Sequence, residues 1–488
     1  MPSITIGVND FVKGVSTSNE IPDGGFSNLA KGQNLLYNIG TISSGCLGQD
    51  RSTNFVNSQQ VVASVRDKGF LGNELYLVTD NGSNGASFFR WSSEAVDPTL
   101  EQTDSTANQY VEGKTDMIYF RGVTYVTSDR DITLLINNLA TMDEDWWSTV
   151  GGTTTLYNQV PHSMIDFDNK LWIADAVSNG AEGTLHSFDG TTGVEDVINF
   201  GKYNTISALG RYETTGDMLI GTDSNANMSS RYAFQTKILV WDGFSPKQNR
   251  EIFTEGRITA FYNLGGITYV FYGQNLGYFN GNGITFLRKL NIKNSYSDLI
   301  YPHKVTDANG TLYIVEGDSI LAYGKLYSGG NRVFYYPHTQ SLAPSGLTTI
   351  KHFGNGTNNT FISTTYVESG TADVKLNYID LDNIETGSTF YSNKYYLPSN
   401  SIIKKVEIIT DKLVASDNIG FELYKSSDES FTSIGTMEYS NDGAVAQKTL
   451  GKDKKIETSV AQIKTTWTAG IPSIKQIKIY YDAIEKEV

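Results

Sequence analysis

Short runs of apolar residues recur along the middle of the chain at a steady spacing. The clearest run is Leu171–Asp175, where nearly every position is apolar, and the polar turn Asp168–Lys170 comes directly before it. Similar runs begin at residues 75, 123, 171, 218, 267, 312 and 360, so neighbouring starts lie 45 to 49 residues apart. A period this constant indicates one supersecondary unit that is repeated seven times.

Each repeat predicts four antiparallel strands. One apolar run precedes the turn, as at Ile206–Leu209, and a third run follows the repeated one, as at Ile238–Trp241. The turns are rich in Gly, Asn and Asp, which tolerate the positive φ angles of tight hairpins. Three third runs end in an aromatic residue, Asp or Asn, and Gly, at Phe188–Gly190, Trp241–Gly243 and Phe279–Gly281. Four strands in about 40–50 residues are the size of one β-propeller blade.

The composition of the repeated runs favours a propeller over other β-folds. A strand with one solvent-exposed face alternates apolar and polar residues, whereas these runs are apolar at nearly every position. We therefore expect both faces to be buried, as they are where each blade packs between two neighbours. The sequence predicts a seven-bladed β-propeller over residues 61–395, with the repeated runs as inner strands and with Trp172 and Ile173 buried between blades.

The two ends of the chain depart from the repeat. Residues 1–60 are rich in Gly, Asn and Ser and predict an extended arm, in which a hairpin at residues 34–42 supplies a strand that closes the ring of blades. The arm docks either on a neighbouring subunit or on this same chain. Residues 396–488 contain alternating runs such as Phe421–Tyr424 and Ile474–Tyr480, which predict a small C-terminal β-sandwich. We therefore expect an all-β chain of three parts.

Net charge and cysteine content argue against several kinds of binding site. The 488 residues include 53 acidic and 38 basic side chains, a net charge of −15, which disfavours a nucleic-acid grip because phosphates need clustered Lys and Arg. The charge serves solubility or, on the wall of a pore, lets DNA pass without binding. The single Cys46 excludes an internal disulfide and a Cys-based zinc site. We see no signal peptide at the start, and no apolar stretch is long enough to span a membrane.

Three aromatic residues are candidate partner contacts. Trp146 and Trp147 stand side by side after three acidic residues, and Trp is favoured at interface anchors. The alternative is that this pair packs onto its own propeller. Tyr232 lies in the long loop 222–236 of the fourth repeat, and long loops often carry function. The same three residues are the exposed aromatic candidates for a sugar-binding surface.

Catalytic, cofactor and metal sites are not expected. Propeller glycoside hydrolases need two carboxylates beside the sugar, and the repeated Asp-containing turns of sialidases are matched only by Tyr439–Gly443, outside the repeats and with no Trp after it. Asp223–Asn227 begins like a calcium loop but lacks the later Gly and Glu that such loops require. The histidines occupy unrelated repeat positions and indicate no Ser-His-Asp triad. They are His162, His186, His303, His338 and His352.

The order of these parts resembles the β-propeller virion proteins of tailed bacteriophages, in particular the tail nozzle and tail hub proteins of short-tailed phages. The segment Glu20–Gly48, with Asn34 before its hairpin and Gly40 inside it, carries most of the resemblance, which covers nearly the whole chain. It implies a non-catalytic structural subunit of a homo-oligomeric ring, in six copies, that contacts other virion proteins. The resemblance places this subunit in the virion tail, after assembly in the host cytoplasm, with only passing contact with DNA. The alternatives are a carbohydrate-binding propeller for host attachment and a glycoside hydrolase.

Overall fold

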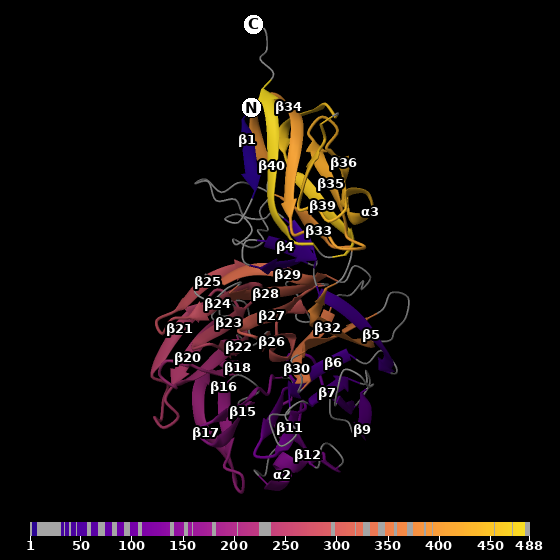
Figure 1. Cartoon of the computed structure of the whole chain (residues 1–488). Coiled ribbons are helices and arrows are strands. Elements are labelled where there is room, and N and C mark those ends of the chain that lie inside the picture. Colours follow the sequence, from indigo (N-terminus) through magenta and orange to yellow (C-terminus); the bar gives the residue numbers. More distant parts are fainter. Residues whose placement is uncertain are drawn as a thin grey trace. The chain divides into compact units, whose positions relative to one another are not determined.

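A computed structural model gives the fold of the chain (Figure 1). It describes residues 2–6, 31–33, 35–38, 41–44, 46–55, 60–66, 74–80, 85–91, 98–105, 110–136, 141–150, 155–158, 160–177, 182–202, 204–223, 236–293, 298–317, 319–325, 332–339, 347–355, 359–367, 374–384, 387–392, 394–452, 454–470 and 472–483. Contacts divide the chain into two compact units, of which one comprises residues 50–318 and 342–378 and the other residues 1–49, 319–341 and 379–488.

Seven sheets of four strands follow the sequence repeat, and we call them blades 1 to 7. Blade 1 holds β6 (Gln60–Arg66), β7 (Leu75–Asp80), β8 (Ala86–Trp91) and β9 (Thr99–Asp104); blade 2 holds β10 (Met117–Phe120), β11 (Val123–Thr127), β12 (Ile132–Ile136) and β13 (Thr141–Asp143). Blade 3 holds β14 (Met164–Phe167), β15 (Lys170–Val177), β16 (Glu182–Phe188) and β17 (Gly193–Lys202); blade 4 holds β18 (Thr205–Arg211), β19 (Met218–Asp223), β20 (Thr236–Trp241) and β21 (Arg250–Thr254). Blade 5 holds β22 (Ile258–Leu264), β23 (Ile267–Tyr272), β24 (Asn275–Phe279) and β25 (Ile284–Lys289); blade 6 holds β26 (Val305–Ala308), β27 (Thr311–Glu316), β28 (Ser319–Lys325) and β29 (Arg332–Thr339). Blade 7 holds β30 (Leu347–Asn355), β31 (Asn359–Val367), β32 (Val374–Ile384) and, from the start of the chain, β5 (Cys46–Phe55).

The innermost strands close a ring. From β6 to β22, each innermost strand contacts the innermost strand of the next blade, and β22 contacts the 3-10 turn Pro302–Lys304 that leads into β26. Strand β26 contacts β30, and β30 contacts β6, so the last blade meets the first. Figure 1 shows β30 beside β6. The fold is therefore the seven-bladed β-propeller that the sequence predicts.

The repeated apolar run is the second strand of every blade, and in blades 1 to 6 it is buried on both faces. In β15, Trp172 packs into a core cluster with β19 and β20 of blade 4, whereas Ile173 packs on the other face with blade 2. Both predictions of burial between blades are confirmed, with 3% and 0% of these side chains exposed. The turn before β15 is a two-residue hairpin in which Asp168 and Asn169 have φ angles of 52° and 59°, as the predicted turn type requires.

The aromatic-Asp/Asn-Gly motif builds the same turn in three consecutive blades. Phe188, Trp241 and Phe279 are buried at the ends of β16, β20 and β24. In each case the Oδ1 atom of the next residue accepts hydrogen bonds from backbone amides two and three positions further along, at 2.7–3.0 Å. The aromatic side chain anchors the turn in the core, and the Asp or Asn side chain shapes it.

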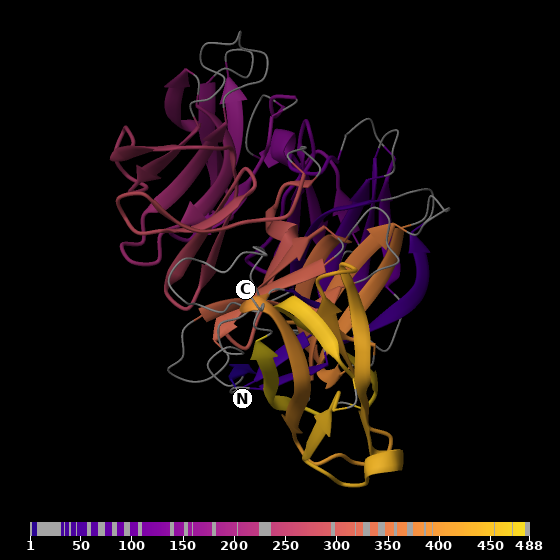
Figure 2. The ribbon, with the colours of Figure 1, turned by 90° about the horizontal axis from the view of Figure 1, so that it is seen from above.

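Ring closure differs in one respect from the prediction. The hairpin exists, since β3 (Leu35–Asn38) pairs with β4 (Thr41–Ser44), but it joins a sheet of the C-terminal unit through Ile42 and Ile474. The strand that completes the last blade is β5, which Figure 2 shows in indigo along the orange strands of blade 7. The hairpin and β5 are adjacent in sequence, and both read as β-strand, so local pattern alone did not decide which one pairs with blade 7.

Besides β28 and β29 of blade 6, the other unit contains a β-sandwich made from both ends of the chain. One sheet has the order β3, β4, β40 (Ile474–Ala483), β34 (Tyr395–Thr410) and β37 (Gln447–Leu450), with β1 (Ser3–Ile6) on β40 and β38 (Ile456–Ala461) on β34. The second sheet has the order β2 (Lys31–Gln33), β33 (Thr389–Tyr391), β39 (Ile463–Ala469), β35 (Asn418–Lys425) and β36 (Ser430–Glu438), and is followed by the short helix α3 (Tyr439–Asp442). Strand β35 buries Ile419, Phe421 and Leu423 in strict alternation. Of the strands in the predicted arm, β1 to β4 therefore belong to this sandwich, and β5 belongs to blade 7. The C-terminal part of the sandwich begins at β33, before the predicted boundary at residue 396.

Candidate functional sites

The paired tryptophans lie in the core and are not free to contact a partner. They form the start of helix α2 (Trp146–Val150), and only 5% of Trp146 and 0% of Trp147 is exposed. The Trp146 ring packs edge-on against Tyr125 and Phe188, with ring centroids 4.8 Å away in both cases. The structure thus replaces the predicted partner contact with packing between blades 2 and 3. The third candidate, Tyr232, lies outside the described residues.

Two histidines that look unrelated in the sequence meet at one buried carboxylate. Asp175 on β15 accepts a hydrogen bond from Nε2 of His186 at 3.0 Å, and its other oxygen lies 3.6 Å from Nδ1 of His162. The Nδ1 atom of His186 accepts the amide hydrogen of Asp196 at 3.0 Å, and Trp147 stacks on the imidazole at 5.3 Å. Both ring nitrogens of His186 are therefore used in holding blade 3 together, and the cluster is structural.

A second buried cluster links blades 2 and 6. Glu112, in the segment before β10, accepts hydrogen bonds from Nζ of Lys304 at 2.6 Å and from Nε2 of His303 at 3.3 Å. All three side chains are buried, and Lys304 also donates to the carbonyl of Leu299 at 3.1 Å. A buried ion pair of this kind needs such additional hydrogen bonds to offset desolvation. The pair fixes the segment before β10 against the segment before β26.

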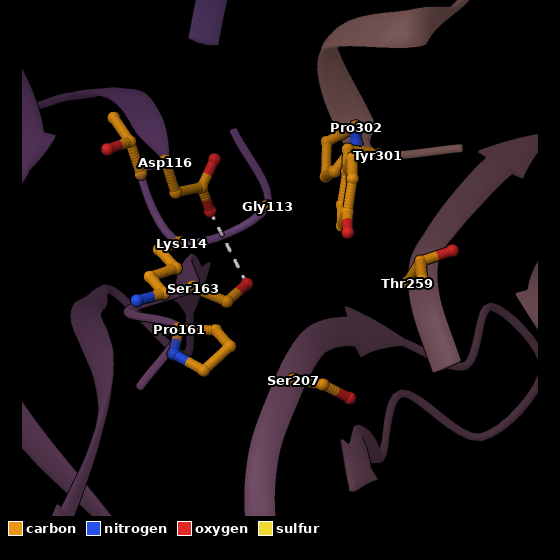
Figure 3. A pocket seen from close by; sticks show the side chains of 10 residues that line it. Gly113, Lys114, Asp116, Pro161, Ser163, Ser207, Thr259, Tyr301 and Pro302 are labelled. Atoms are coloured by element: carbon orange, nitrogen blue, oxygen red, sulfur yellow. Dashed lines mark hydrogen bonds between the residues drawn. The ribbon is translucent and has the colours of Figure 1, made fainter. Parts of the chain in front are cut away.

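A pocket at the centre of the ring is lined by residues on or just before the innermost strands of blades 2 to 6 (Figure 3). Figure 3 shows the hydrogen bond between Asp116 and Ser163. The same Asp116 oxygen accepts the amide hydrogen of Met164 at 2.8 Å, and Ser207 donates to the carbonyl of Ile258 at 2.7 Å. With a cavity volume of about 20 Å³, the pocket has room for about one water molecule. These side chains join neighbouring blades and do not form a ligand site.

A larger hollow, which we call the turn groove, lies between turns that connect strands of blades 3 and 4. It has a cavity volume of about 560 Å³, within the range of about 300–1,000 Å³ that is typical of ligand sites. The β14–β15 turn of blade 3 and two turns of blade 4 form its walls. The lining residues are Asp166, Phe167, Asp168, Asn169, Arg211, Thr215, Gly216, Asp217, Asp242 and Phe244.

The turns hold the polar side chains of the groove in place. The Asp242 carboxylate accepts hydrogen bonds from the hydroxyl of Ser245 and the amides of Phe244 and Ser245, which hold its pKa well below the usual range. Partial burial raises the pKa of Asp166, against the opposing positive charges of Arg121 and Arg211. Arg121 of blade 2 donates to the carbonyl of Asn169 at 2.9 Å and so fixes the blade 3 turn.

The sequence predicts two of the turns that line this groove, but not that they lie close together. Asp168 and Asn169, like Asp242 and Gly243, belong to predicted turns, and each pair lies between two strands. Their convergence depends on how blade 4 packs against blade 3. A comparison of the three related turns offers the one local signal, because Phe244 stands where blades 3 and 5 carry Thr191 and Asn282.

No three His, Cys, Asp or Glu side chains within the described residues come together in a way that could hold a metal ion. None of the described helices has the length and hydropathy of a membrane span.

Comparisons with known proteins give similarity to solved structures only. No family model and no curated protein matches the chain. Similar structures include BBS1N in complex with ARL6DN (11% identity, 69% of this chain and 97% of that chain, TM-score 0.43) and the AfRom2 CNH domain (10% identity, 70% and 100%, TM-score 0.40). A third is an exo-β-1,3-galactanase from Phanerochaete chrysosporium (8% identity, 68% and 98%, TM-score 0.26). The propeller assignment rests on the pairing within the seven sheets and the contacts between them.

Proposed function

We propose that the chain is a structural, non-catalytic subunit of a tailed-bacteriophage virion and assembles with copies of itself into a ring of the tail nozzle or hub. The order of parts supports this proposal: a glycine-rich start, a hairpin, seven blades and a terminal sandwich follow one another as in the phage proteins that the sequence resembles. A ring of six copies is the state that the resemblance implies.

The observation that carries the proposal is a series of exposed apolar side chains on the outermost strands of the blades. Leu100 on β9, Val194 on β17, Phe253 on β21 and Phe286 on β25 are exposed by 53%, 50%, 65% and 57%. Outermost strands also have unpaired backbone groups along one edge, and natural proteins usually protect such edges with charge or cover. Large apolar side chains at these edges favour contact with another protein surface. We therefore assign the blade rims to contacts between neighbouring subunits.

Native mass spectrometry and negative-stain imaging of the full-length protein test the assembly. The expected result is a closed ring with a single copy number. The double variant Phe253→Lys, Phe286→Lys should stay monomeric, since it places charge on the rims, and its melting temperature should match that of the unchanged protein because both positions are exposed.

A matched variant with two added lysines away from the rims, Thr214→Lys with Ser427→Lys, should still form rings, because both residues are exposed in turns. A full-length protein that stays monomeric at every concentration would contradict the ring. Proteomics of density-banded phage particles tests the virion assignment separately, and absence of the chain from those particles would rule it out.

A further inference from the structure

The turn groove contains an exposed aromatic side chain that its turn does not require. Phe244 is 79% exposed, and its amide donates to Oδ1 of Asp242 at 2.9 Å. The equivalent amides of Thr191 in blade 3 and Asn282 in blade 5 make the same bond at 2.9 and 3.0 Å. Three different side chains thus occur at this position of the turn. The turn itself does not require a phenyl ring, so we look for the role of Phe244 in the groove.

The polar groups of the groove offer both hydrogen-bond donors and acceptors. Asp242 and Asp168 present carboxylates, while Arg211 and Asn169 present N–H donors. The Arg211 guanidinium lies close enough to act on the charge of Asp166, and within the part of the chain that the structure describes it forms no ion pair. Among the described residues, no group of carboxylates or other ligands could hold a metal ion.

We propose that the turn groove binds a carbohydrate. A sugar ring has an apolar face that packs on an aromatic ring, and hydroxyl groups that each donate one hydrogen bond and accept others. The groove supplies an exposed aromatic platform, Phe244, and its lining also includes hydrogen-bond acceptors and donors. A basic peptide would also be attracted, since four Asp side chains line the groove against the single Arg211, but it would make no use of the exposed phenyl ring, which favours the sugar. The site lies within blades 3 and 4, so it does not depend on the proposed ring.

The variant Phe244→Thr removes the platform and leaves the turn intact, because Thr191 occupies the equivalent position in blade 3. The full-length protein and this variant would be applied to a printed array of bacterial and mammalian glycans, and each glycan that binds would then be titrated calorimetrically. We expect the unchanged protein to bind at least one glycan structure and Phe244→Thr to bind it at least about tenfold more weakly, a loss of about 1.4 kcal/mol. Tyr396→Thr is the matched control, since it removes an aromatic ring that is 66% exposed from β34 of the sandwich, outside the groove, and should bind as the unchanged protein does.

Three results would overturn the proposal. They are the absence of binding across the array by a folded protein, equal binding by Phe244→Thr, and loss of binding in Tyr396→Thr alone. A lysine-rich peptide that binds in a Phe244-dependent way, with no glycan bound, would assign the groove to a basic partner instead. Glycan binding by a protein that forms no ring would support the carbohydrate site in the groove and contradict only the proposed assembly.

Discussion

Two adjacent residues of strand β15 hold three blades together. The Trp172 ring packs edge-on against Trp241 of blade 4 with centroids 5.1 Å apart, and its Nε1–H donates to the carbonyl of Phe167 at 3.0 Å. Ile173 points to the opposite face and packs with blade 2. The alternation of side chains along a strand therefore becomes, in a propeller, an alternation between two neighbouring blades.

Replacing Trp172 by Ala should lower the free energy of unfolding by about 3–5 kcal/mol, because it removes a buried indole and leaves a cavity between blades 3 and 4. Urea denaturation followed by tryptophan fluorescence and circular dichroism measures the loss. Phe286→Ala, at a position that is 57% exposed, is the control and should change stability little. An unchanged denaturation midpoint for Trp172→Ala would mean that this face of β15 does not carry the packing.

The turn after β16 predicts a specific response to acid. Asp189 is exposed, but its Oδ1 accepts hydrogen bonds from the amides of Thr192 and Thr191 and from the Thr191 hydroxyl, and these lower its pKa to about 2. An Asp with a folded pKa below its unfolded value of about 3.9 stabilises the fold above that pH, and the contribution is lost as the pH falls through about 2. Asp189→Ala should therefore lower the melting temperature at pH 7, with a gap from the unchanged protein that narrows between about pH 4 and pH 2.

The control for this turn comes from blade 5, where Asn280 accepts the same backbone hydrogen bonds. Asp189→Asn keeps the acceptor and should lose less stability at pH 7 than Asp189→Ala. Scanning calorimetry at several pH values makes both comparisons. A gap for Asp189→Ala that stays constant down to pH 2 would show that the carboxylate does not act through its charge.

At the scale of secondary-structure elements, the first strands of the chain serve two different units. Strands β1 to β4 complete the sandwich sheets, and β5 is the fourth strand of blade 7. A propeller whose last blade is completed by the start of the chain resists opening, because separating blade 1 from blade 7 also requires β5 to leave its sheet. The order of strands therefore predicts unequal effects of two truncations.

Removing residues 1–30 takes away β1 alone among the described strands and should leave a propeller that unfolds cooperatively near the original temperature. Removing residues 1–59 also takes away β5, leaves blade 7 with three strands, and should lower the unfolding temperature and expose that blade to proteases. Thermal unfolding and limited proteolysis with mass spectrometry distinguish the two. Equal stability of both truncated proteins would contradict the closing role of β5.

The sequence predicted elements better than it predicted their partners. Seven repeats, the two-residue turns and the burial of Trp172 follow from local pattern, because a strand buried on both faces must be apolar throughout. The pairing of the hairpin with β40 depends on contacts between residues more than 400 positions apart, such as Ile42 and Ile474, and local pattern carries no record of these. For a related reason, the sequence did not decide whether the tryptophan pair contacts a partner or packs onto its own propeller. A large indole suits an interface and an interior equally well.

At the scale of the whole molecule, the charge balance constrains how copies can meet. With 53 acidic and 38 basic residues, the subunits of the proposed ring would repel one another, and this repulsion would have to be offset where they touch. The rim side chains to which we assign the contacts, Leu100, Val194, Phe253 and Phe286, are apolar, so the attraction that we propose does not come from ion pairs. Salt therefore acts on the repulsion and leaves the attraction in place.

We accordingly expect ring formation to strengthen as sodium chloride is raised, because a salt concentration of about 0.1 M screens charges beyond about 10 Å while apolar contacts persist. Sedimentation velocity of the full-length protein at low and moderate ionic strength measures the shift from monomer to ring. Rings that dissociate as salt rises would show that subunits meet through ion pairs.

Contact with DNA should change in the opposite direction, since phosphate binding weakens with salt, and double-stranded DNA should not be retained at physiological ionic strength. DNA held at that ionic strength would place a basic surface where DNA passes.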